Sequence, residues 1–209
     1  MQPNTQPDPF DWTPQPVLIV ISGPSGAGKD TVVQRLRERG CPFHFVVTAT
    51  DRPLRPGEVH GEDYYFYTTQ EFERLIEQGE LIEYAIVYGQ YKGVPKAHIR
   101  AALASGQDVV MRVDVQGAAS IKKLVPGAVL VFLTCESKDE LVDRLRQRRS
   151  ETDEELQGRI KTSLEELDRI PEFNYVVVNR KGALDDAVDD ILAIIRAERC
   201  RANPPPIEL

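Results

Sequence analysis

Nine consecutive residues near the start of the chain have the types and spacing of a phosphate-binding loop. They are Gly23, Pro24, Ser25, Gly26, Ala27, Gly28, Lys29, Asp30 and Thr31. In this pattern the first and sixth positions are glycine, so that successive backbone N–H groups can point at phosphates, and the lysine reaches the outer phosphates. A glycine-rich turn without a ligand is the alternative, but a buried strand before the loop and a helix after it favour a phosphate site.

Asp30 is unusual, because the pattern normally has a magnesium-binding hydroxyl at this position. A carboxylate is also a good ligand for Mg²⁺, so Asp30 is a candidate metal ligand. The same carboxylate brings negative charge towards a polyphosphate. We therefore expect a nearby cation to balance it.

A second set of phosphate-binding side chains is predicted in a proline-stiffened loop. Arg52 and Arg55 lie three residues apart there, and Tyr64 follows. The planar guanidinium group matches phosphate oxygens in a bidentate way, and a phenol adds another donor. Two arginines in a solvated loop would be an ordinary finding, so the prediction depends on the rest of the chain.

Glu83 follows an apolar stretch that is predicted to be a strand. It could be an exposed acid at the end of that strand. Alternatively, its carboxylate could accept hydrogen bonds from the N1–H and N2–H₂ groups of guanine. Adenine has no such donor pair, so a buried Glu83 would reject it.

Arginines also gather at Arg144, Arg146, Arg148, Arg149 and Arg159, in a chain with a net charge of −7. Arg144 and Arg148 are four residues apart, so they share one face of a helix. A surface helix held by salt bridges is one explanation. The other is a lid that brings arginines to a transferring phosphoryl group.

The elements that would position these residues alternate between strands and helices, which predicts an α/β fold with a parallel sheet flanked by helices. Core strands are expected at 17–22, 43–48, 109–113, 128–133 and 175–179, and helices at 31–39, 97–104, 118–124, 138–148, 153–167 and 184–199. Short strands at 64–67, 81–87 and 91–94, with a helix at 70–78, interrupt this order and predict an inserted lobe.

These patterns predict a core at 17–47, 96–143 and 168–200, a lobe at 48–95 and a lid at 144–167. The proline-rich ends, 1–16 and 201–209, are expected to be a disordered lead and a loose tail. The lead lacks the features of a secretory signal.

Composition limits the possible functions. With 209 residues, of which 41% are hydrophobic, the chain can form one core with small inserted lobes. The acidic balance argues against nucleic acid as a partner, and no apolar stretch is long enough to predict a membrane span. Three widely separated cysteines fit neither a disulfide framework nor a metal site, so a cytoplasmic location is expected.

Together these motifs resemble the guanylate kinase family of nucleoside monophosphate kinases, from about residue 17 to residue 199. The resemblance rests on 23–31, 48–64, 83–95, 113–117, 144–159 and 176–179. It implies a P-loop core, an inserted GMP-binding lobe and a helical lid. It also implies transfer of the γ-phosphoryl group of ATP to GMP or dGMP with Mg²⁺, by a monomer or a homodimer.

The resemblance implies a role for each matching residue. Lys29, Arg144, Arg148 and Arg159 would be catalytic; Gly23 to Thr31 and Asn179 would bind ATP; and Thr48, Arg52, Arg55, Tyr64, Glu83, Lys92 and Asp114 would bind GMP.

The sequence departs from the family pattern at four positions. Asp30 replaces a serine, Arg112 an aspartate, Lys92 a tyrosine and Val94 a small hydroxyl residue. Lys92 can keep the role of a phosphate donor. The first two changes look coupled, and we expect Arg112 to pair with Asp30.

Three alternatives stay open at this stage. The Gly-Lys-Asp sequence also resembles ribose 1,5-bisphosphate phosphokinase, for which a base-reading Glu83 would have no use. A scaffold domain related to guanylate kinase would be expected to lack the loop lysine. A regulatory nucleotide switch is disfavoured by the complete acceptor site.

Overall fold

The computed structural model describes residues 13–87, 89–147 and 153–209. Its core is a five-stranded sheet with the order β2-β7-β1-β8-β9, in which all neighbouring strands are parallel. The strands are β1 (Leu18–Ser22), β2 (His44–Phe45), β7 (Val109–Arg112), β8 (Val129–Thr134) and β9 (Tyr175–Val178). The predicted α/β fold with a parallel sheet is therefore confirmed.

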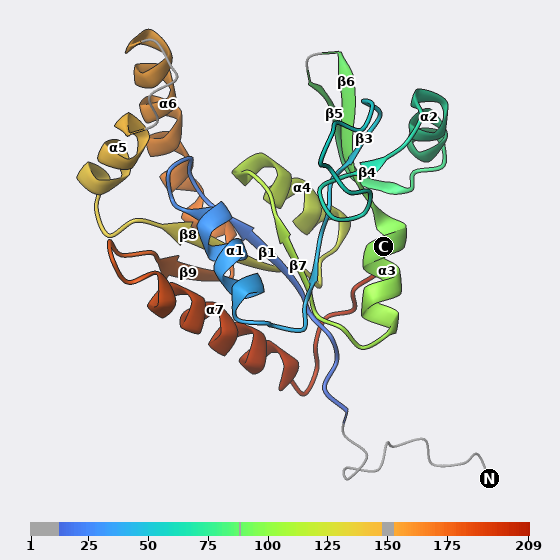
Figure 1. The fold of residues 1–209 in the computed structure, drawn as a ribbon. Coiled ribbons are helices and arrows are strands. Elements are labelled where there is room, and N and C mark those ends of the chain that lie inside the picture. Colours follow the sequence, from blue (N-terminus) through green and yellow to red (C-terminus); the bar gives the residue numbers. More distant parts are fainter. Residues whose placement is uncertain (1–12, 88, 148–152) are drawn as a thin grey trace, which may run out of the picture.

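Helices cover both faces of this sheet, as Figure 1 shows. Ile19 and Ile21 of β1 pack in one hydrophobic cluster, with residues of α1 (Lys29–Glu38) and α7 (Leu184–Arg199). Leu18 and Val20 pack in another cluster, with residues of α3 (Lys96–Ala104) and α4 (Val115–Leu124). Because side chains alternate along a strand, one fully buried strand supplies both clusters.

The lobe has its own sheet, with the strand order β4-β3-β6-β5. Its elements are β3 (Ala49–Thr50), β4 (Tyr65–Phe66), α2 (Thr69–Glu77), β5 (Leu81–Val87) and β6 (Gln90–Pro95). The core strand predicted at 43–48 is present but shorter, because β2 covers only His44–Phe45. The chain then leaves the core sheet and enters the lobe sheet at β3.

The predicted lid falls on two helices, α5 (Lys138–Arg146) and α6 (Asp153–Glu166), followed by a 3₁₀ helix at Leu167–Glu172. Leu141 and Leu145 of α5 pack against Leu156, Ile160 and Leu164 of α6. The predicted lid boundary at residue 144 divides α5, so the helical pair begins earlier, at Lys138. Figure 1 shows this pair and the lobe projecting separately from the core.

The C-terminal tail is not loose, which corrects the prediction for 201–209. Ile207 and Leu209 pack against the core cluster of α3 and α4, and the carbonyl oxygen of Leu209 accepts a hydrogen bond of 3.0 Å from Arg100 Nε. Most of the predicted N-terminal lead, residues 1–12, lies outside the described residues. Within the described ranges, no helix is both long and apolar enough to span a membrane.

Candidate active site

The phosphate loop joins β1 to α1 and depends on backbone conformations that favour glycine. Gly23, Gly26 and Gly28 have φ values of 136°, 88° and 93°. A Cβ atom at Gly23 would lie 2.0 Å from the carbonyl oxygen of Leu133 on the neighbouring strand β8. The sequence-predicted loop is therefore formed, and close packing on β8 requires its first glycine.

Lys29 lies inside this loop. Its ammonium group donates hydrogen bonds to the carbonyl oxygens of Gly23 and Pro24, the latter at 3.0 Å. A cavity of about 300 Å³ next to the loop is lined by Gly23, Ser25, Gly26, Gly28, Lys29, Asp30, Thr31, Asp114 and Glu166. A cation and the glycine-rich main chain thus border one cavity, which suits an anionic group.

Asp30 and Arg112 form an ion pair, so the expected contact is confirmed. Arg112 is the last residue of β7, directly beside Ile21 of β1, and this register brings it to the start of α1. The guanidinium group balances the carboxylate that replaces the usual hydroxyl. Both side chains remain accessible, with exposed fractions of 48% for Arg112 and 65% for Asp30.

Asn179 and Arg144 support the other side of the loop. The buried Asn179 donates a hydrogen bond of 2.9 Å to the carbonyl oxygen of Ala27, and Arg144 donates to the same oxygen and to the carbonyl oxygen of Asn179. Arg144 also pairs with Glu140. Both residues line a cavity of about 330 Å³ that is distinct from the phosphate cavity. The structure thus places Arg144 with the predicted ATP-binding Asn179.

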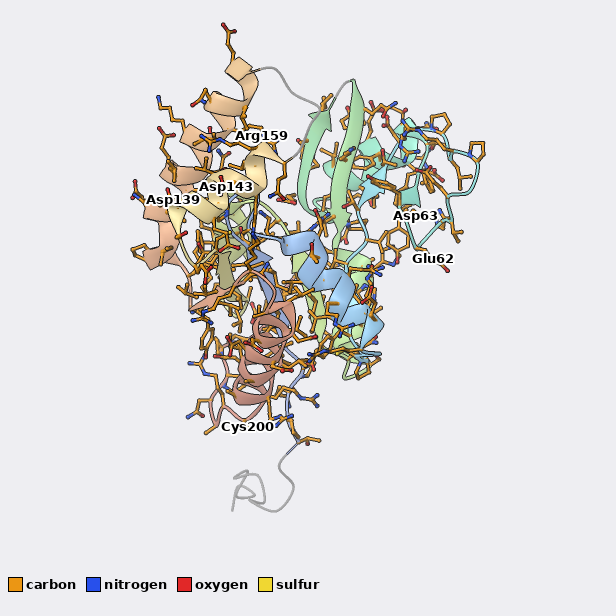
Figure 2. All side chains as sticks on the ribbon, turned by 60° about the vertical axis from the view of Figure 1, so that its left-hand side comes forward. Glu62, Asp63, Asp139, Asp143, Arg159 and Cys200 are labelled. Carbon is orange, nitrogen blue, oxygen red and sulfur yellow. The ribbon has the colours of Figure 1, made fainter. Side chains whose placement is uncertain are left out.

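Of the other two lid arginines, Arg159 contacts the phosphate loop, and Arg148 lies outside the described residues. Arg159 Nη2 donates a hydrogen bond of 2.7 Å to the hydroxyl of Ser25. Figure 2 shows Arg159 in the lid and Cys200, which follows α7, at the opposite end of the molecule. The lid therefore touches the loop through a side chain that the sequence had singled out.

Glu83, Thr48 and Lys92 lie in a larger cavity, of about 530 Å³, between the lobe and the core. Asp114 lines this cavity as well as the phosphate cavity, and its side chain caps α4 by accepting a hydrogen bond of 2.7 Å from the Gly117 N–H. This cap explains why α4 begins at Val115, earlier than predicted. The cavity thus brings together four residues that were predicted to bind the phosphoryl acceptor: Thr48, Glu83 and Lys92 from the lobe and Asp114 from the core.

The carboxylate of Glu83 lies against the first turn of α4. A Cβ atom added at Gly117 would be 2.7 Å from Glu83 Oε2, so only glycine leaves room for it there. Burial raises the pKa of Glu83, and the nearby Asp114 carboxylate raises it further. Two acids that repel each other in a cavity favour a ligand that supplies hydrogen-bond donors.

Arg52 is buried and positioned by Glu58, a residue that the sequence analysis left without a role. Arg52 Nη1 lies 2.7 Å from Glu58 Oε2, and its guanidinium carbon lies 4.9 Å from the centre of the Tyr64 ring. Lys92 Nζ lies 5.8 Å from the same ring. Arg52, Tyr64 and Lys92 therefore form one group, although Arg52 and Tyr64 do not line the 530 Å³ cavity.

Arg55 differs from Arg52, because it is exposed and its backbone rather than its guanidinium group makes the contact with Glu58. The signal for Glu58 was present in the sequence as an acid six residues after Arg52. A spacing of this kind across a loop does not predict a contact unless the turn is known. Glu166, which lines the phosphate cavity, was not predicted either. Here the spacing did contain a signal, because Glu166 follows Arg159 by two helical turns on the same face of α6.

Two cavities share Asp30 and Asp114, and one of them lies at a P-loop. The chain also has a helical pair that carries basic residues. These features define a P-loop phosphotransferase. The sequence pattern described as guanylate kinase matches residues 15–198. The chain belongs to the guanylate kinase family, and its activity is the transfer of the γ-phosphoryl group of ATP to GMP.

Relatives and a solved structure agree with this assignment. The chain is 49% identical over 203 residues to guanylate kinase 2, chloroplastic/mitochondrial, of Oryza sativa subsp. japonica, covering 97% of this chain and 71% of that protein. It is 43% identical to guanylate kinase of Caldanaerobacter subterraneus subsp. tengcongensis, covering 90% and 91%. The crystal structure of guanylate kinase from Anaplasma phagocytophilum is 30% identical, with a TM-score of 0.66 and coverage of 91% and 89%.

Proposed function

We propose that the two cavities sharing Asp30 and Asp114 hold the donor and the acceptor of this reaction. The phosphate cavity would take the ATP phosphates on the main chain of the loop and on Lys29. The cavity beside Asn179 and Arg144 would take the adenosine part of ATP. This arrangement puts the end of the triphosphate next to the larger cavity, as direct transfer requires.

The residues around the loop fit a magnesium ion bound together with ATP. Asp30, Thr31 and Asp114 supply oxygen atoms at the phosphate cavity, and oxygen is the ligand that Mg²⁺ prefers. The described residues contain no group of three acidic, histidine or cysteine ligands, which agrees with an ion that keeps waters and phosphate oxygens. Asp30 would be one of the residues that hold the ion while it pairs with Arg112. When bound, the ion would neutralise charge on the phosphates.

The 530 Å³ cavity would hold the guanine base of GMP. Glu83 and Asp114 would accept hydrogen bonds from the base edge, and Thr48 would add its hydroxyl. Since the pKa of Glu83 is already raised by burial and by Asp114, guanine N–H donors would stabilise its charged form. Adenine would leave these acids without donors, which gives a physical reason for selectivity.

The GMP phosphate would meet the group formed by Arg52, Tyr64 and Lys92. Glu58 keeps the Arg52 guanidinium group in one orientation, so less rotamer entropy would be lost on binding. The Lys92 ammonium group would replace a phenol donor of the family pattern. Arg55 is exposed and would reach the phosphate only from the outer side of this loop.

The lid arginines would complete the site around the transferring group. Arg159 already reaches the loop through Ser25, and Arg148 would act from the segment between α5 and α6. A preorganised cation at this point stabilises developing charge and can contribute on the order of 10³–10⁵ in rate. Enclosure by the lid would also exclude water, which limits hydrolysis of ATP.

The observation that carries this proposal is the meeting of Glu83 and Asp114 in the cavity next to the phosphate loop. The test is Glu83→Gln, with Glu73→Gln on the exposed side of α2 as a control that removes the same charge from the same lobe. We expect Glu83→Gln to raise KM for GMP by about 10²-fold, since a lost charged acceptor costs this much, and to leave KM for ATP unchanged. An unchanged KM for GMP would contradict the proposed role.

A ribose bisphosphate acceptor is disfavoured by the same observation, because a sugar phosphate has no base edge for Glu83 to read. Use of dGMP, a monomeric or dimeric state and a cytoplasmic location stay predictions. The three free cysteines fit a reducing compartment.

A further inference from the structure

Glu166 places a carboxylate in the cavity that the phosphate loop borders. It is the last residue of α6, and its side chain is partly buried. An acid in a site for anions needs an explanation, because it repels the phosphates that the site would bind. Neither the sequence motifs nor the residue roles proposed above use it.

The side chain of Glu166 lines this cavity together with Ser25 and Lys29, which offer donors to a phosphate. Burial raises the pKa of Glu166 and the nearby Asp114 raises it further, whereas the positive charge of Lys29 and the main chain of Ser25 oppose this rise. The cavity therefore holds a carboxylate whose charge is only partly balanced, and the balancing cation is the lysine that a phosphate would use.

Arg159 gives α6 a direct contact with the same loop. It lies two helical turns before Glu166 and donates a 2.7 Å hydrogen bond to the Ser25 hydroxyl. One helix thus contacts the loop through Arg159 and lines its cavity with Glu166. A change at the loop that moves Glu166 would act on the helix that carries Arg159.

We propose that Glu166 is a built-in counter-ion of the phosphate loop, which competes with the phosphates of ATP. This inference rests on the donor site proposed above. In the protein without nucleotide, the carboxylate supplies a negative charge to the cavity that Lys29 lines. Binding of a triphosphate displaces it, because two anions cannot share this cavity at no cost. Glu166 is thus a positioning residue that links the end of α6 to the occupancy of the loop.

The test is calorimetric titration of ATP, and of pyrophosphate, into the full chain with EDTA present. Glu166→Gln keeps the size of the side chain and removes its charge. Glu165→Gln is the matched control, because Glu165 is exposed on the same helix and faces Lys161. We expect Glu166→Gln to bind both ligands about fivefold tighter or more, from the removal of one nearby like charge. The control is expected to bind as the wild type does.

Equal affinities of Glu166→Gln and Glu165→Gln would overturn the proposal. The ATP titration is repeated with Mg²⁺ in place of EDTA. Weaker binding of ATP by Glu166→Gln only in the presence of Mg²⁺ would make Glu166 a metal-linked residue and would also overturn the proposal. Weaker binding both with EDTA and with Mg²⁺ would show a purely structural role and would overturn it too. Should Glu166→Gln not fold, as judged by thermal unfolding, Glu166→Ala is expected to show the same tightening. Failure of the wild type to bind either ligand would instead contradict the donor site.

Discussion

The phosphate loop and the proposed GMP site differ in how they are built. The loop is one run of consecutive residues whose ligands are mainly backbone groups, positioned by glycines and by contact with β8. The GMP site collects side chains from segments far apart in the chain: Thr48, Arg52, Tyr64, Glu83, Lys92 and Asp114. One site is local, and the other exists only when the lobe packs on the core.

This difference has an electrostatic side. The main-chain donors of the loop keep their positions without a counter-ion on each group. The side chains of the GMP site depend on one another: Arg52 is paired with Glu58, while Glu83 and Asp114 repel. We conclude that a variant at the loop should strongly lower the rate of phosphoryl transfer. Variants at the lobe should instead affect either the binding of GMP or the stability of the fold.

The largest effect is expected from Lys29→Ala. Its ammonium group is the charged donor inside the loop, and removal of one preorganised donor lowers kcat by about 10²–10³-fold. Since Lys29 does not line the cavity proposed for GMP, the Kd of GMP should stay unchanged in equilibrium titration. Lys138→Ala, at an exposed lysine of α5, is the control. A large loss of GMP affinity would show that the two sites are not separate.

An intermediate effect is expected at the ion pair between the two sites. Asp30→Ser leaves the Arg112 charge without its partner, whereas Arg112→Asp places a second carboxylate beside Asp30. We expect each to lower kcat/KM for ATP about tenfold or more. The double variant carries the residue types of the family pattern at both positions and should recover most of the loss. Steady-state kinetics of the four proteins measures this coupling. Additive losses in the double variant would mean that the pair is accidental.

The smallest effect is expected on the pH dependence of stability in the lobe. Hydrogen bonds from Arg52 are the largest cause that lowers the pKa of Glu58, from 4.5 to about 2. A lowered pKa stabilises the fold above pH 4.5, and this contribution is lost as the pH falls towards 2. Thermal unfolding between pH 2 and 6 should show a smaller change of Tm for Glu58→Gln than for the wild type.

The exposed Glu62, labelled with Asp63 in Figure 2, offers a control in the same loop. Glu62→Gln is expected to keep the wild-type change of Tm with pH. The same change in all three proteins would contradict the contribution of the Arg52–Glu58 pair.

The sequence predicted local features better than most contacts between distant segments. The phosphate loop and α7 were predicted correctly, since glycine spacing and helical periodicity can be read along the chain. The Asp30–Arg112 pair joins distant segments, and it was predicted from two departures from the family pattern that exchange an acid and a base. The early end of β2 and the passage of the chain to the lobe sheet at β3 were not predicted, because short apolar runs do not reveal which sheet they join. The packed tail was missed for a related reason: consecutive prolines indicate an irregular backbone, not whether a core surface receives it.

The site followed the same rule. Glu83 and Asp114 were placed in one GMP site by the family resemblance and not by their spacing in the chain, since only the packing of the lobe on α4 brings them together. Glu58 and Glu166 were missed, because each acts through a partner whose position depends on a turn or on the lid. Arg144 was predicted to be catalytic. Its contacts place it on the Asn179 side of the loop, and its role in catalysis stays a prediction.

The central claim is that Glu83 reads the edge of guanine, and comparison of GMP with IMP tests it most directly. IMP lacks the 2-amino group and so removes one of the two proposed donors to Glu83. The ratio of kcat/KM for GMP over IMP should be about 10²-fold or more in the wild type and should fall towards one in Glu83→Gln, because the missing hydrogen bond then costs little. An equal ratio in both proteins would contradict the claim.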